Sequence, residues 1–157
     1  MTLFPIQTIL IAMLGFAQIQ LGQTQISRER ITILAGEEGK QLCMAWPTEF
    51  GFSKKSKISE PPEAELSAML GALPKFLKQT RPDVFNKFQV CHLQIIHIVQ
   101  SDGSYLFVSA FPQQILEFSP EWKNKPVIVD DGGSAVWRVR YSIKSKKFSH
   151  LSVNGVA

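Results

Sequence analysis

The sequence lacks the residue patterns that mark most enzymes and cofactor proteins. Only two cysteines and three histidines occur among its 157 residues, and their spacing matches no metal site. No glycine-rich phosphate loop, nucleophile elbow or internal repeat is present. We therefore expect no catalytic residue, no bound metal and no cofactor, and we expect that the protein is not an enzyme.

Charge is absent from the first 27 residues, which contain one continuous apolar run, ILIAMLGFA, at 9–17. The run is shorter than the roughly 20 residues of a membrane-spanning helix, and it ends in small residues that suit a signal peptidase. It predicts a signal peptide at 1–17 and a secreted or periplasmic protein. The alternatives are an uncleaved anchor, through which alone the protein would meet a membrane, and an ordinary buried helix.

Export would place both cysteines in an oxidising compartment, where two thiols in one small domain tend to pair. We therefore expect a disulfide between Cys43 and Cys91. Two buried free thiols are the alternative, because cysteine is among the residues most often fully buried.

The rest of the chain is long and apolar enough for one domain with its own core. Residues 18–30 are polar and rich in glutamine, which is typical of a flexible lead-in, and we expect the domain at 31–157. A strand is predicted at 31–35, whereas 41–46 fits either a short strand or the first turn of a helix. Apolar residues at helical spacing predict one main helix from Glu63 to Leu73, which Gly71 and Pro74 should weaken or end.

A hairpin at 91–111 has apolar residues on both faces. With Asp102 and Gly103 as a two-residue turn, Ser101 pairs with Ser104 and Ile98 with Phe107. An antiparallel pair with one solvated face alternates apolar and polar residues, so both faces of this pair must be covered. The predicted helix covers one, and the N-terminal segment, a strongly curved sheet or another molecule covers the other. The residues expected there are Ile96, Ile98, Tyr105 and Phe107.

A second hairpin, at 134–143 and 148–156, carries most of the excess positive charge. Residues 121–157 contain seven basic and three acidic side chains, while residues 1–120 contain ten of each. Matching the apolar sides of the two strands predicts a connection of three or five residues. The basic side would attract a protein partner with an anionic surface, or it is simply a solvated face. Its candidate binding residues are Arg138, Arg140, Lys147 and His150.

The remaining polar residues have structural interpretations. His97 lies among apolar neighbours and is expected to bond a backbone carbonyl or a water, while His92 points to the opposite face. Asp130 and Asp131 precede two glycines, as in a turn, and Ser134 follows them without a nucleophile motif. Aromatic residues are too scarce beside the basic side chains for a nucleic-acid site.

These elements predict an α+β fold with one main helix packed on a four- to five-stranded antiparallel meander, with a strongly curved sheet as one form of it. The order of a helix followed by long antiparallel strands is similar to cystatin-like and NTF2-like folds, and this resemblance implies no functional residue.

Two functions follow as hypotheses. The first is an exported, non-enzymatic interaction or inhibitor-like module that binds a protein partner, or a second copy of itself, through its sheet surface. The second is a small-ligand pocket protein, or a weak enzyme, with a site around His97 in a cavity between helix and sheet. A cavity lined by Leu93, His97, Trp137 and Tyr141 would favour the second.

Overall fold

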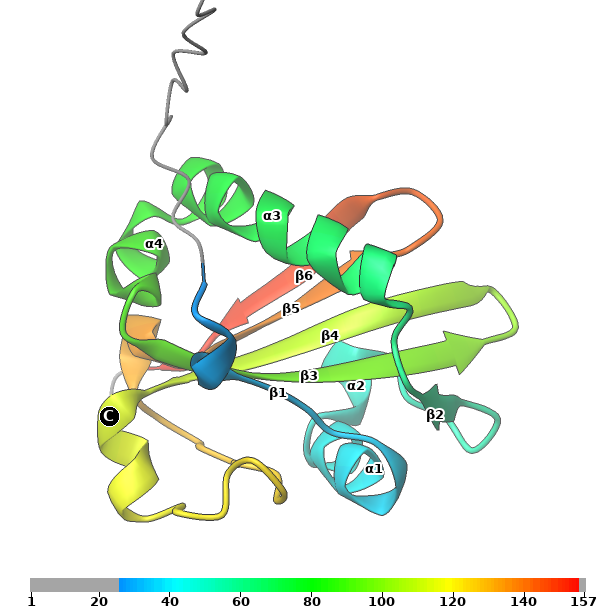
Figure 1. Cartoon of the computed structure of the whole chain (residues 1–157), viewed down its shortest axis with the longest axis horizontal. Helices are drawn as coiled ribbons and strands as arrows, with labels where there is room; N and C mark the ends of the chain where they lie inside the picture. Colours follow the sequence, from blue (N-terminus) through cyan, green and yellow to red (C-terminus); the bar gives the residue numbers. More distant parts are fainter. Residues whose placement is uncertain (1–25, 156–157) are drawn as a thin grey trace, which may run out of the picture.

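An open sheet of six strands forms the middle of the protein, with helices on both of its sides (Figure 1). This computed structural model describes residues 26–155. The predicted signal peptide at 1–17 and the first part of the predicted lead-in lie outside the described residues. The chain is α+β, as expected. Its elements are η1 (Arg28–Arg30), β1 (Ile31–Ile33), α1 (Gly36–Ala45), α2 (Pro47–Phe50), β2 (Lys57–Ser59), α3 (Glu63–Thr80), α4 (Pro82–Phe88), β3 (Cys91–Gln100), β4 (Gly103–Pro112), η2 (Gln113–Glu117), η3 (Gly133–Ala135), β5 (Trp137–Ser142) and β6 (Lys147–Val153).

The sheet is mixed, and this corrects the expectation of a purely antiparallel meander. Strands β3 to β6 do form an antiparallel meander. Strand β1, however, runs parallel to β3, and β2 pairs antiparallel with the same strand further along. Helices cover both sides of this open sheet, instead of the one helix in a curved sheet that the cystatin-like and NTF2-like order implies.

Helices α3 and α4 cover one side of the sheet, called here the α3 face. Leu73 and Leu77 of α3 are fully buried against Leu93, Ile95 and neighbouring strand residues. The helix begins at the predicted residue but continues through Pro74 to Thr80. A proline inside a helix removes one backbone hydrogen bond, and burial of leucines on both sides of Pro74 offsets that loss.

Helices α1 and α2 cover the other side, called here the α1 face. The ambiguous segment 41–46 forms the second half of α1, which ends at Ala45, with Trp46 as its C-cap. Both ends of the excursion from 34 to 56 are fixed to β3, because β1 precedes it and β2 follows it on the same strand. Leu42, Cys43 and Phe50 of this excursion pack on Ile96 and Phe107. The two apolar faces of the hairpin are thus both covered by the chain itself.

The β3–β4 hairpin differs from its predicted register by two residues. Gln100 pairs with Gly103 and Ile98 with Tyr105, so the turn is Ser101 and Asp102. Side chains alternate with a period of two, and a shift of two residues leaves every side chain on its predicted face. The assignment of faces is therefore confirmed although the pairing is wrong.

The β5–β6 hairpin differs from its prediction in another way. Ser142 pairs with Lys147, which leaves a connection of four residues rather than three or five. The register then shifts between Arg138 and Arg140, at a bulge where His150 has a positive φ of 53°. The extra residue brings Phe148, Leu151 and Val153 to the α3 face together.

The long segment between β4 and β5 packs on the far end of the α1 face. Trp122 and Val127 of this segment join Phe111 in a small apolar cluster. Gln94 is fully buried and donates to the carbonyls of Trp122 and Lys125, at 2.6 and 2.7 Å, while it accepts from the Val127 N–H. Residues 126–132 form neither helix nor strand. None of the helices within residues 26–155 combines the length and apolar character needed to cross a membrane.

Candidate partner-binding surface

The four apolar residues predicted to meet a partner are covered by α1 and α2 instead. Ile96, Ile98 and Phe107 are at most 1% exposed and Tyr105 is 9% exposed. The rings of Phe50 and Phe107 lie edge to face, with centroids 4.7 Å apart. This face is part of the core, so in this conformation it offers no surface to a partner or to a second copy.

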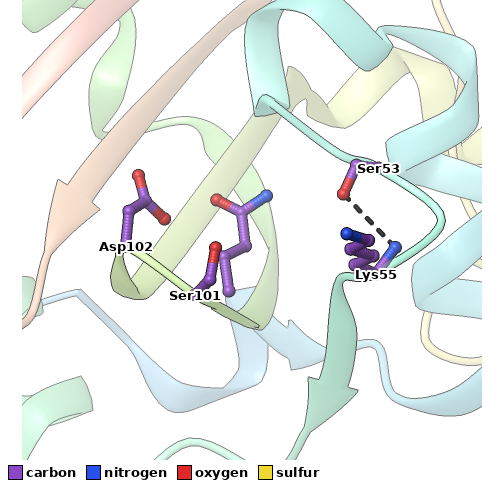
Figure 2. Close-up of a pocket in the computed structure, with 5 residues that line it drawn as sticks. Ser53, Lys55, Ser101 and Asp102 are labelled. Atoms are coloured by element: carbon purple, nitrogen blue, oxygen red, sulfur yellow. Dashed lines mark hydrogen bonds between the residues drawn. The ribbon is translucent and has the colours of Figure 1, made fainter.

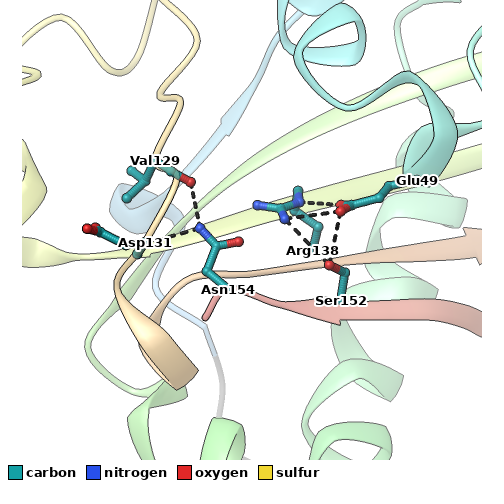
Figure 3. Close-up of polar contacts among 6 residues, drawn as sticks. All are labelled: Glu49, Val129, Asp131, Arg138, Ser152 and Asn154. Atoms are coloured by element: carbon teal, nitrogen blue, oxygen red, sulfur yellow. Dashed lines mark hydrogen bonds and ion pairs between the residues drawn. The ribbon is translucent and has the colours of Figure 1, made fainter. Parts of the chain in front are cut away.

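Arg138, the first of the predicted basic residues, is occupied within the protein. Its guanidinium is ion-paired with Glu49 of α2 and stacks on the Trp46 ring, with Cζ 4.1 Å from the centroid. Ser152 Oγ donates to Glu49 at 3.1 Å (Figure 3). Arg138 is 5% exposed, and its Nη1 has no hydrogen-bond partner among the described residues. This residue anchors α2 to the sheet and is not available for binding.

Arg140 lies two residues further on the same strand face, and it packs on an aromatic ring without an ion pair to any described residue. Its guanidinium stacks on the Tyr105 ring, with Cζ 3.6 Å from the centroid. The Tyr105 hydroxyl donates to Asp102 at 3.0 Å, so the ring beneath the arginine is itself fixed. The side chain is half-buried, and no acidic residue within 26–155 forms an ion pair with it.

Lys147 and His150, the other two predicted binding residues, are exposed. Lys147 pairs directly with Ser142, which in turn pairs with Tyr105, so the lysine belongs to the same face as Arg140. His150 is the bulged residue and lies outside the regular alternation. The predicted basic set is therefore divided: Arg140 and Lys147 share an accessible surface, Arg138 is buried, and His150 is displaced by the bulge.

A polar hollow lies between the loop after α2 and the β3–β4 turn (Figure 2). Its volume is about 220 Å³, and Lys55 and Asp102 stand on opposite sides of it. Gln100, which also lines it, donates to the carbonyl of Gly51, while Gly51 lies close to Arg140: a Cβ there would be 3.4 Å from Nη1. The remaining lining residues are Ser53 and Ser101.

Sequence reasoning missed this hollow. Its residues come from two segments that are about 45 positions apart, and no pattern links them in the sequence. The one available signal was the run of lysines in SKKSK, which places three basic side chains in a loop without an acidic one. We define the Arg140 surface as Arg140, Lys147 and the adjoining hollow.

His97 has a structural role, in agreement with the sequence-based interpretation. Its Nδ1 lies 3.0 Å from the Glu60 carbonyl and 2.9 Å from Ser59 Oγ, and its Nε2 lies 2.6 Å from Ser104 Oγ. Leu93, Trp137 and Tyr141 are fully or almost fully buried in the core on the α3 face. His97 is therefore held on both ring nitrogens by groups that fix β2 and β4 to β3.

The two cysteines are free thiols, which corrects the predicted disulfide. Cys91 belongs to the core on the α3 face and Cys43 to the core on the α1 face, so the sheet separates them. Burial raises the pKa of Cys43 to about 12 and the pKa of Cys91 to about 11. Neither thiol has the lowered pKa of a reactive cysteine.

Other candidates for chemistry are engaged in local structure. The carbonyl of Asp131 accepts from the Asn154 side chain at 3.2 Å, and Ser134 lies in the short η3 turn. No cluster of three or more histidine, cysteine or acidic side chains could hold a metal ion within residues 26–155.

Comparison with protein families, with curated proteins and with solved structures finds no match for the chain.

Proposed function

We propose that the protein is an exported, non-catalytic module that binds a protein partner through the Arg140 surface. The observation that carries this proposal is that Arg140 stacks on Tyr105 and has no ion-pair partner within residues 26–155. An arginine that is half-buried, stacked on a fixed tyrosine and without an internal ion pair has the character of an interface hot spot, where Arg and Tyr are enriched. The neighbouring Arg138 shows the contrast, because Glu49 already neutralises it.

The adjoining hollow supports a protein partner over a small ligand. Ligand pockets usually enclose about 300 to 1,000 Å³ and are mostly apolar. The hollow is smaller, at about 220 Å³, and its lining consists of polar and charged side chains. A space of this size and character fits one polar side chain of a partner better than a free metabolite.

The alternative site around His97 has less support. A general base needs a ring nitrogen that can reach a substrate. Both nitrogens of His97 are within 3.0 Å of Ser59, Glu60 or Ser104. Neither nitrogen of His97 is free to act as a general base, and this supports the binding module over the weak enzyme.

The experiment is a quantitative capture comparison from an envelope or secreted extract of cells that make the protein. Wild-type protein, Arg140→Glu and Lys75→Glu are immobilised in equal amounts. Lys75 is exposed on α3, on the opposite side of the sheet. Its replacement by glutamate changes the net charge by the same amount as Arg140→Glu, which makes it the matched control. We expect one protein that is retained by wild type and by Lys75→Glu and is lost with Arg140→Glu. Equal retention of that protein by wild type and both variants would exclude the Arg140 surface.

Export is the part of the proposal that rests on the N-terminal sequence. Intact-mass measurement of protein from a secreting host should show the loss of about 17 residues, as the small residues at the end of the apolar run imply. Full-length chain recovered from the cytoplasm would contradict export and leave the binding surface to be tested separately.

A further inference from the structure

We infer that the Arg140 surface recognises an extended acidic segment with carboxylates on alternate residues, received by Arg140 and Lys147. This inference rests on the proposed function and names the chemistry of the partner.

The separation of the two basic residues follows from the strand register. Arg140 pairs with Ser149, and Lys147 lies two residues before Ser149 on β6. Arg140 and Lys147 are therefore diagonal neighbours on one face, with their Cα atoms roughly 7 to 8 Å apart. Both side chains are accessible, since Arg140 is half-buried and Lys147 is exposed.

An extended peptide offers carboxylates at a similar spacing. Residues i and i+2 of a strand point to the same side and are about 6.6 to 6.8 Å apart. An Asp or Glu at every second position would therefore place one carboxylate on Arg140 and the next on Lys147. Two adjacent acidic residues would point to opposite sides, so that only one of them reaches a cation.

Arg140 is held in place before any partner arrives. Tyr105 lies under the guanidinium at 3.6 Å, and the end of α2 at Gly51 lies beside it. A guanidinium that is already ordered loses less side-chain entropy on binding and presents parallel N–H donors to a carboxylate. The stack on Tyr105 therefore favours Arg140 as the primary contact and Lys147 as the second.

The protein's own acidic side chains near this surface are already engaged. Glu49 is paired with Arg138 and Glu65 with Lys146. Asp102 accepts a hydrogen bond from the Tyr105 hydroxyl and remains the one acidic side chain that lines the hollow. Lys54 and Lys55 lie in the loop that borders the hollow and Lys57 begins β2, and the loop contains no acidic residue. The surface thus has excess positive charge without an internal counter-ion for Arg140, which suits an acidic segment.

The inference is tested by titrating the full ¹⁵N-labelled chain with two peptides of the same composition. One is acetyl-Thr-Glu-Thr-Glu-Thr-Gly-amide, and the other is acetyl-Thr-Glu-Glu-Thr-Thr-Gly-amide. The Arg140 Nε–Hε signal and the backbone signals of β6 report binding. The alternating peptide should bind about tenfold more tightly, because it adds one charge-assisted hydrogen-bonded contact.

Two variants complete the test. Lys147→Gln should remove the difference between the peptides, whereas Lys75→Gln should preserve it. Equal affinity for the two peptides, or no shift of Arg140 with either, would overturn the inference. The capture comparison with Arg140→Glu tests the proposed function independently. If Arg140→Glu loses the captured partner but the wild-type protein binds neither peptide, the Arg140 surface is the binding site and the acidic segment is not what it recognises.

Discussion

Arg138 and Glu49 lie 89 positions apart in the sequence and form an ion pair that joins β5 to α2. Arg140 has the same side-chain chemistry and the same strand face, yet it has no acidic partner among the described residues. The difference comes from the position of α2, which places a carboxylate over one arginine and only the backbone of Gly51 beside the other. One arginine therefore stabilises the fold, and the other is left for binding.

Removing the carboxylate of Glu49 should destabilise the protein strongly. Glu49→Ala leaves the buried Arg138 guanidinium without a counter-ion. Breaking a fully buried pair costs about 3 to 5 kcal/mol, and the loss should lie near the lower end because the Glu49 side chain is 29% exposed. Glu63→Ala breaks the exposed pair with Arg28 and should cost less than about 1 kcal/mol. Urea unfolding of both variants gives the two free energies, and equal losses would show that the Arg138 pair is not buried as described.

Phe107→Lys should prevent stable folding. The Phe107 side chain is 1% exposed beneath Phe50, and truncation of a buried phenylalanine alone costs about 3 to 5 kcal/mol. A buried, unpaired ammonium adds to that loss. Circular dichroism and thermal unfolding measure the effect, with Val99→Lys as a control at a partly exposed position on the same hairpin. A folded Phe107→Lys protein would show that α1 and α2 do not cover this face.

The two thiols should be present and unreactive in the native protein. A maleimide reagent should label neither Cys43 nor Cys91 at neutral pH, and it should label both after denaturation without reductant. Stability should also decline in alkali. The folded thiols keep their protons to about pH 12 and 11, whereas unfolded thiols lose them near pH 9.0, so the free energy of unfolding falls as the pH rises above about 9. Absence of labelling after denaturation would indicate a disulfide.

The bulge at His150 should tolerate glycine better than a β-branched residue. His150 has a φ of 53°, a conformation that costs an L-residue about 1 to 2 kcal/mol. His150→Val should therefore lower the free energy of unfolding by about 1 kcal/mol or more, because valine is poorly compatible with positive φ. His150→Gly should be close to neutral. The reverse order of stability would place the bulge elsewhere on β6.

The faces of the central hairpin could be predicted because they depend only on alternation. The predicted pairing of Ile98 with Phe107 was wrong, but the true pairing with Tyr105 differs by an even number of residues. The β6 strand was harder, since the bulge depends on the backbone angle of His150, which the identity of the residue does not reveal. The three residues of β2 were too few for any periodicity to appear.

The candidate site could be predicted only in part. Arg140 and Lys147 were recognised from the alternation of β5 and the charge of the β5–β6 connection. The burial of Arg138 depends on Trp46 and Glu49, which the sequence places almost 90 positions away. The cover of the apolar face was not evident from the sequence either. Residues 41–46 fitted a strand as well as a helix, so the packing of α1 on this face could not be predicted.

The most direct test of the Arg140 surface is site-specific photo-crosslinking in cells that make the protein. A benzophenone residue replaces Ser149, which is exposed and pairs with Arg140, or Ser67, which is exposed on α3 on the opposite side of the sheet. We expect the Ser149 position to yield a crosslinked protein partner on irradiation, and Arg140→Glu in the same chain to abolish that crosslink. Crosslinks from Ser67 alone, or a Ser149 crosslink that persists with Arg140→Glu, would show that the Arg140 surface is not the binding site.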